Sequence, residues 1–249
     1  MKTVVITGAA GGLGRTLTVR LREHGYHVIP TDIRDAEVYL DVTSAEACRE
    51  LAVTIEPDIW INCAGVLGAG DAATQPDQVI ERVLDVNLLG VMHGTRAALM
   101  VMRARGSGHV INVASLAAWV PVPGECVYAA TKAAVLSFTL GVVAELRGAG
   151  FRNVHCSVVC PDGMLTPMLT SELANPAIAL SFTGLRMTDP DAVTRRILAL
   201  LRRPRLIASV PRYRGLQVRM IGMFPGAGLR LAPVFEWIGR RKQRTVRGD

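Results

Sequence analysis

The chain has 249 residues, of which 50% are hydrophobic and 20% are charged. This length suits one α/β domain, and the composition excludes disordered, collagen-like and low-complexity proteins. The five cysteines contain no Cys-x-x-Cys pair, which argues against a disulfide framework and against a zinc site. We therefore expect a reducing, cytoplasmic setting and no metal.

The net charge of +7 is unevenly distributed along the chain. Residues 1–194 hold 14 basic and 19 acidic residues, whereas residues 195–249 hold 14 basic and 2 acidic residues. The sequence therefore predicts a mildly acidic domain with a basic C-terminal end.

Apolar segments bounded by glycine alternate with segments of helical period. This alternation is typical of βαβ units and a parallel sheet. The predicted strands are 3–7, 27–31, 38–40, 58–62, 109–114, 153–159 and 206–210. The predicted helices are 12–24, 44–55, 76–104, 127–147 and 190–202.

Two segments fit neither pattern. Residues 162–188 are rich in apolar side chains, with Pro and Gly spaced so that no long helix is comfortable. Long apolar loops of this kind are usually functional. Residues 211–249 mix arginine with large apolar residues and helix breakers, and the sequence predicts no secondary structure for them.

The first predicted strand leads into a glycine-rich turn, which an amphipathic helix follows. Glycine permits a tight turn and a close approach to a pyrophosphate, and the helix N-terminus supplies N–H donors. The order of strand, turn and helix therefore predicts a dinucleotide site that includes Gly8, Gly12, Leu13 and Gly14.

Asp32 ends the second predicted strand, 18 residues after Gly14. A carboxylate there accepts hydrogen bonds from both hydroxyls of an adenosine ribose and repels a 2′-phosphate, which favours NAD over NADP. Arg15 and Arg34 stand nearby and weaken this preference. The alternative interpretation of Asp32 is a simple turn residue.

Further candidate cofactor contacts follow other strands, at the sheet edge where open α/β folds bind ligands. Ile33, Asp41 and Val42 follow the second and third strands and are expected near the adenosine. The fourth strand ends in the segment Asn62-Cys63-Ala64-Gly65. We interpret Cys63 as a small buried residue.

Ser115 closes the fifth predicted strand, so its hydroxyl is expected at the same edge. Tyr128 and Lys132 stand four residues apart, which places them on one helix face. A phenol with a pKa near ~10 is a poor base at neutral pH, and a neighbouring positive charge favours the phenolate. We therefore predict that Tyr128 is a general acid–base and that Ser115 bonds the same substrate oxygen. Asn87 alone would most often be a buried amide.

These motifs, in this order, resemble the short-chain dehydrogenase/reductase family over roughly residues 3–210. The resemblance implies a catalytic tetrad of Asn87, Ser115, Tyr128 and Lys132. It implies that Asn87 holds a water of a proton relay and that Lys132 also binds the nicotinamide ribose. The residues that it places near the nicotinamide carboxamide are Pro161, Gly163 and Thr166.

The sequence departs from the family pattern at a few positions. Cys63 replaces the second asparagine of the motif that begins at Asn62, and Thr131 replaces a common serine. Asp162 follows Pro161 where the family has glycine. No departure removes a catalytic group, but Asp162 places a carboxylate or an altered turn near the nicotinamide.

Apolar residues dominate both predicted substrate walls, 116–123 and 162–188. They favour a lipophilic secondary alcohol or ketone of steroid, terpenoid or long-chain type. The alternative is that they pack a lid against the domain. The tail could be a lid, a peripheral membrane segment or a solvated end, and it matches no recognised nucleic-acid-binding fold.

The sequence therefore predicts a Rossmann-type, doubly wound parallel sheet of seven strands, in the order 3-2-1-4-5-6-7. Residues 1–210 form the catalytic domain, with a substrate loop at 162–188, and residues 211–249 form a basic, apolar extension. We expect NAD-dependent hydride transfer to or from a lipophilic alcohol or ketone. The alternatives are an NADPH-dependent 3-oxoacyl reductase and a non-catalytic dinucleotide-sensing or membrane-associated scaffold. The family resemblance implies a homodimer or homotetramer.

Overall fold

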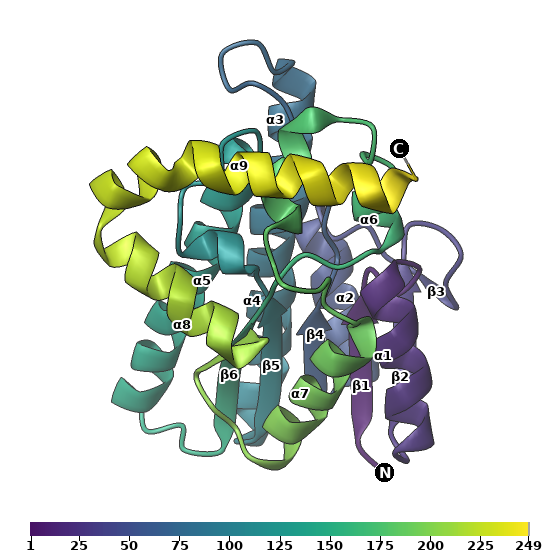
Figure 1. Cartoon of the computed structure of the whole chain (residues 1–249). Helices are drawn as coiled ribbons and strands as arrows, with labels where there is room; N and C mark the ends of the chain where they lie inside the picture. The colour runs from purple at the N-terminus through teal and green to yellow at the C-terminus, as the bar shows by residue number, and fades with distance from the viewer. Residues whose placement is uncertain (249) are drawn as a thin grey trace.

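A computed structural model, which describes residues 1–248, joins all the predicted strands into one parallel sheet (Figure 1). Its order, β3-β2-β1-β4-β5-β6-β7, confirms the predicted Rossmann-type topology. Valine and isoleucine dominate the central strands because helices cover both faces of the sheet. The strands are β1 (Thr3–Thr7), β2 (His27–Asp32), β3 (Val38–Tyr39), β4 (Ile59–Asn62), β5 (Gly108–Val113), β6 (Val154–Pro161) and β7 (Ile207–Val210).

Helices cover the two faces of the sheet in separate layers. On one face α1 (Gly12–Glu23) packs against α7 (Pro190–Arg202), and their apolar side chains join one core cluster. On the other face the core contains α2 (Ala45–Ile55), α4 (Gly90–Arg105) and α5 (Cys126–Gly148). This double layer leaves the carboxyl ends of the strands free to form a site.

The predicted helix 76–104 is not a single α-helix. It consists of α3 (Asp77–Leu84), a π-helical turn at Asp85–Leu89 and then α4. The wide turn carries Asn87, which is fully buried. The side-chain amide of Asn87 donates to the carbonyl of Val66 and accepts from the N–H of Val66, both at 2.8 Å. Single π turns of this kind are frequent at functional sites.

In length and composition, α5 is the one helix of the described chain that could span a membrane, with a mean hydropathy of 1.6. Its place in the fold gives another reason for this apolar character. Val135, Thr139 and Val142 lie at successive turns of α5, and all three are buried. The helix therefore packs as a core helix against the sheet.

The segment 162–188 contains only short helical pieces, as its sequence predicts. They are α6 (Pro167–Thr170) and a 3₁₀ segment at Pro176–Phe182. Ile178 and Phe182 of the 3₁₀ segment are buried in a small apolar cluster of their own. The loop is therefore packed rather than extended into solvent.

The C-terminal tail forms two helices that the sequence does not predict, α8 (Arg212–Met223) and α9 (Pro225–Arg247). Two of the breakers stand where a helix tolerates them, because Pro211 precedes α8 and Pro225 opens α9. Figure 1 shows α9, in yellow, across one end of the molecule. It packs there against the 3₁₀ segment, and Gln243 donates to the carbonyls of Leu173 and Asn175, just before that segment, at 3.0 and 2.8 Å.

Candidate active site

A cavity of about 1300 Å³ opens at the carboxyl ends of the central strands. Most of the predicted site residues, which come from segments far apart in the sequence, share its wall. They are Gly8, Gly12, Leu13, Gly14, Asp32, Ile33, Asp41, Val42, Ala64, Gly65, Ser115, Tyr128, Lys132, Pro161, Gly163 and Thr166. Asn62 and Asn87 lie behind this wall, where both are buried.

The glycine-rich turn brings backbone against backbone. Gly8 has a φ of 69°, and a Cβ atom at this position would lie 2.5 Å from the Cα of Ala64. The α1 helix then begins without a side-chain cap, so its first N–H groups have no side-chain acceptor. A Cβ at Gly12 would lie 2.7 Å from the Thr166 side chain. This cradle fits a dinucleotide pyrophosphate, which the uncapped helix start would hold.

Asp32 stands beside the glycine-rich turn in a fixed orientation. One of its carboxylate oxygens accepts from the N–H of Ala10 at 3.0 Å, and the other accepts from its neighbour Ile33 at 2.8 Å. Each oxygen keeps a lone pair for a further donor, as a ribose hydroxyl would require. The carboxylate of Asp41, in contrast, accepts hydrogen bonds within its own turn, from the N–H and the hydroxyl of Thr43.

Asn62 is part of a buried polar network beneath the site. Its amide accepts from Trp60 Nε1 at 2.7 Å and donates to Asn112 Oδ1 at 2.8 Å and Thr95 Oγ1 at 3.1 Å. The structure thus gives this side chain structural partners that fix the end of β4. Cys63 does line the cavity, and burial raises the pKa of its thiol to about 12, as expected of an unreactive residue.

Gly65 brings two of the predicted catalytic residues to one place. A Cβ atom at this glycine would lie 3.3 Å from Asn87 Oδ1 and 3.7 Å from Lys132 Nζ. A side chain here would therefore crowd both groups. The backbone after β4 thus passes directly between the π-helical turn and α5.

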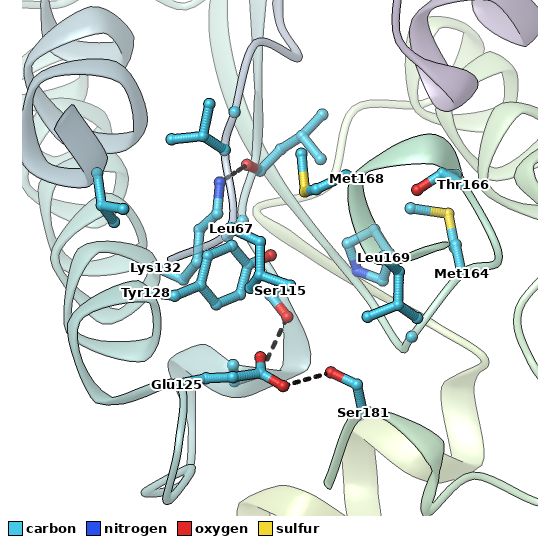
Figure 2. Close-up of a pocket in the computed structure, with 18 of the residues that line it drawn as sticks. Leu67, Ser115, Glu125, Tyr128, Lys132, Met164, Thr166, Met168, Leu169 and Ser181 are labelled. Atoms are coloured by element: carbon cyan, nitrogen blue, oxygen red, sulfur yellow. Dashed lines mark hydrogen bonds between the residues drawn. The ribbon is translucent and has the colours of Figure 1, made fainter. Parts of the chain in front are cut away.

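Ser115, Tyr128 and Lys132 meet at the same edge of the sheet (Figure 2). The hydroxyl of Ser115 accepts from the N–H of Ala117 at 3.1 Å, which orients the serine at the end of β5. Lys132 Nζ donates to the carbonyl of Val113 at 3.2 Å and lies 5.5 Å from the centre of the Tyr128 ring. The ammonium is thus tied to the strand and held over the phenol.

Burial governs the charges of this pair. It raises the pKa of Tyr128, the nearby Glu125 adds to this effect, and a hydrogen bond with Ser115 opposes it. Burial also lowers the pKa of Lys132 to about 8. The sequence led us to expect a neighbouring charge to favour the phenolate, but burial outweighs it in this structure. Tyr128 is therefore protonated at neutral pH, which suits a proton donor.

Glu125 belongs to the site, although no sequence pattern predicted it. It immediately precedes α5 and is only 2% exposed. Its carboxylate accepts from Ser181 Oγ at 2.7 Å, and burial raises its pKa to about 7. Its position one helical turn before Tyr128 was the available signal, but an acidic residue at a helix start is usually an exposed cap.

The tail also contributes to the cavity. Val218 and Ile221 of α8 and Leu229 and Phe235 of α9 line it. Their helical spacing in the sequence was a signal that the proline and glycine residues of the tail obscured.

Asp162 is the departure from the family pattern that anchors this tail. Its carboxylate accepts from Arg214 Nε at 2.8 Å, and Arg214 also donates to Thr183 Oγ1 at 3.0 Å. The side chain of Asp162 is 12% exposed and that of Arg214 is 9% exposed. The carboxylate thus joins the end of β6 to α8.

A dinucleotide cradle that faces a tyrosine–lysine pair across one sheet edge defines a nicotinamide-dependent oxidoreductase. Comparison with known families agrees, because the model of the short chain dehydrogenases matches residues 2–177. The chain belongs to the short-chain dehydrogenase/reductase family. It is therefore an NAD(P)-dependent oxidoreductase that acts on CH–OH groups.

Individual relatives are distant. The chain is 30% identical over 203 residues to the 2-(R)-hydroxypropyl-CoM dehydrogenase of Xanthobacter autotrophicus. The match covers 71% of this chain and 80% of the relative. A short chain dehydrogenase/reductase from Burkholderia phymatum, solved with NAD, has a TM-score of 0.77 at 24% identity, covering 88% of this chain and 92% of that one. A short chain dehydrogenase from Burkholderia cenocepacia, solved with NADP, has a TM-score of 0.78 at 22% identity. The match covers 92% of this chain and 95% of that one. The fold is thus compatible with either cofactor.

Proposed function

We propose that the protein interconverts a lipophilic secondary alcohol and its ketone, with NAD as the preferred cofactor. One observation carries this proposal: a single, largely apolar cavity contains both the Tyr128–Lys132 pair and Asp32. Asp32 supports a preference for NAD, because its negatively charged carboxylate would repel the 2′-phosphate of NADP.

In this proposal each polar side chain has a defined task. The nicotinamide, when bound, supplies the hydride acceptor or donor. Tyr128 takes the hydroxyl proton of the alcohol, or returns it to the carbonyl oxygen during reduction. Ser115 donates a hydrogen bond to the same oxygen. Lys132 stabilises the phenolate and binds the nicotinamide ribose, and Asn87 supports a water of the proton relay.

The tail completes the substrate side of the cavity. We propose that residues 1–210 form the catalytic domain and that 211–249 act as its lid, because Val218, Ile221 and Phe235 add apolar surface to the cavity. Such walls suit a steroid, terpenoid or long-chain substrate. We further propose a cytoplasmic homodimer or homotetramer. The comparisons give no support to membrane contact through the tail.

The test follows NADH formation over secondary alcohols of graded hydrophobicity, with Tyr128→Phe as the blank. We expect rates that rise with apolar size, with NAD and not with NADP. Alkaline pH favours the assay, because burial raises the pKa of Tyr128 and leaves little phenolate at neutral pH, whereas the phenolate fraction grows as the pH rises. Activity with NADP alone would favour the 3-oxoacyl reductase. Complete inactivity with alcohols and carbonyls would favour a non-catalytic scaffold.

Substitution of Asp32 tests the cofactor preference directly. Asp32→Ser is expected to lower kcat/KM for NAD about tenfold, because hydrogen bonds to a charged group are lost. It should also raise kcat/KM for NADP, because the repulsion of the 2′-phosphate disappears. Steady-state kinetics with both cofactors measure this, and the exposed Asp77→Ser is the control. An unchanged ratio of NAD to NADP efficiency would contradict the assignment.

A further inference from the structure

Glu125 is a buried carboxylate that the proposed chemistry does not use. It lines the cavity together with apolar residues such as Val120, Val122 and Leu180. A carboxyl group in such surroundings is costly to bury unless hydrogen bonds satisfy it. Because Glu125 lines the cavity, a ligand bound there can add a hydrogen bond to the one that Ser181 donates.

The fold holds Glu125 rigidly. Its N–H donates to the carbonyl of Val122 at 2.9 Å. The preceding Gly124 has a φ of 83° and packs so closely on Ala177 that a Cβ atom there would overlap the backbone of the 3₁₀ segment. Ser181 of that segment donates to the carboxylate at 2.7 Å. The turn thus fixes the backbone of Glu125 against the 3₁₀ segment, and Ser181 of that segment orients the carboxylate.

The carboxylate lies close to the reacting groups. Figure 2 shows it between Ser181 on one side and Ser115 and Tyr128 on the other. Its influence on the pKa of Tyr128 agrees with this proximity. A donor that reached Glu125 from the substrate would therefore stand near the carbon that carries the reacting oxygen.

The carboxylate also has capacity for such a donor. Two carboxylate oxygens offer about four lone-pair positions, and the hydrogen bonds drawn to them in Figure 2, that from Ser181 among them, leave others free. No ion pair of the described residues includes Glu125. The site is thus electrostatically suited to a hydroxyl or ammonium donor.

We infer that Glu125, held by Ser181, selects a lipophilic alcohol that carries a second hydrogen-bond donor, a hydroxyl or an ammonium group, next to the carbinol. This inference rests on the proposed alcohol oxidation and makes its substrate class narrower. An alcohol without the second donor adds no hydrogen bond to this carboxylate beyond those that the protein supplies. Sites of this kind discriminate strongly against the analogue that lacks the donor.

Three substrates with one carbon skeleton test the inference: 1-phenyl-1-propanol, 1-phenyl-1,2-propanediol and 2-amino-1-phenyl-1-propanol. We expect at least one donor-bearing substrate to exceed the simple alcohol about 10- to 100-fold in kcat/KM, the range of a hydrogen bond to a charged group. Glu125→Met should reduce this preference at least tenfold. Glu145→Gln is the matched control, because it removes an exposed carboxylate from α5, the helix that Glu125 immediately precedes, and should leave the preference unchanged.

Two further measurements test the inference if Glu125→Met fails to fold or if no alcohol is oxidised. Glu125→Gln preserves the shape of the side chain and should weaken the preference for the ammonium analogue if Glu125→Met fails to fold. Calorimetric titration of the diol and the amino alcohol into Tyr128→Phe, with and without Glu125→Gln, measures binding without turnover. If no alcohol is oxidised, the proposed function fails, and the calorimetry still decides the inference. Equal affinities with and without Glu125, or a preference that both Glu125 variants retain, would overturn it.

Discussion

Tyr128→Phe is expected to lower kcat for alcohol oxidation about 10³-fold or more, while the Kd for NADH stays nearly unchanged. The substitution removes one hydroxyl and keeps the ring, so the packing over Lys132 persists. The proton of the substrate alcohol then loses its acceptor. Steady-state kinetics measure the loss, and a fluorescence titration with NADH measures binding.

A second tyrosine provides the control for this variant. Tyr26→Phe removes a hydroxyl from a half-buried ring that packs against the core away from the cavity, so activity should be retained. Substantial activity in Tyr128→Phe would show that another group accepts the proton. Glu125 is the first candidate, because its pKa of about 7 makes it a competent base near neutral pH.

The strands and the cofactor cradle follow from local sequence. Apolar runs that end in glycine or a polar residue predict the strand ends, and ligands of parallel sheets bind at those ends. Asp32, the last residue of β2, and Ser115, just after β5, are examples, since each lines the cavity. Their placement needs little information from distant parts of the chain.

The features that the sequence did not predict depend on distant partners. The π turn presents Asn87 to the backbone of Val66, which stands 21 residues earlier. The burial of Glu125 involves Ser181, 56 residues later. The α9 helix packs on the 3₁₀ segment, and Gln243 reaches Leu173 just before that segment, 70 residues earlier in the chain. Neither periodicity nor propensity reports such contacts, because they form only when the chain is folded.

The pKa of Tyr128 illustrates the same limit in electrostatics. The spacing of Tyr128 and Lys132 correctly predicts their proximity, since the ammonium lies over the ring. It does not reveal how far water is excluded from the pair. Burial raises the pKa of the phenol and lowers that of the ammonium, so desolvation opposes ionisation of both groups.

Arg214→Met is expected to lower the free energy of unfolding by about 3 kcal/mol, because it leaves the Asp162 carboxylate buried without its cation. The guanidinium also bonds Thr183, so the variant loosens α8 from the substrate loop. Denaturation by urea, with the slope compared between variants, measures the effect. Arg212→Met is the control, since Arg212 is exposed on the same helix and should change stability by less than about 0.5 kcal/mol.

A double variant separates the charge effect from the loss of packing. Asp162→Asn combined with Arg214→Met removes both charges and should recover most of the lost stability, because no unpaired charge remains buried. A loss below about 1 kcal/mol in Arg214→Met would instead mean that water reaches the pair, as at a surface ion pair. Because Val218 and Ile221 of α8 line the cavity, the single variant should raise KM for the lipophilic alcohol more than Kd for NADH. Such a split would identify the Asp162–Arg214 pair as the anchor that holds the tail over the substrate side of the site.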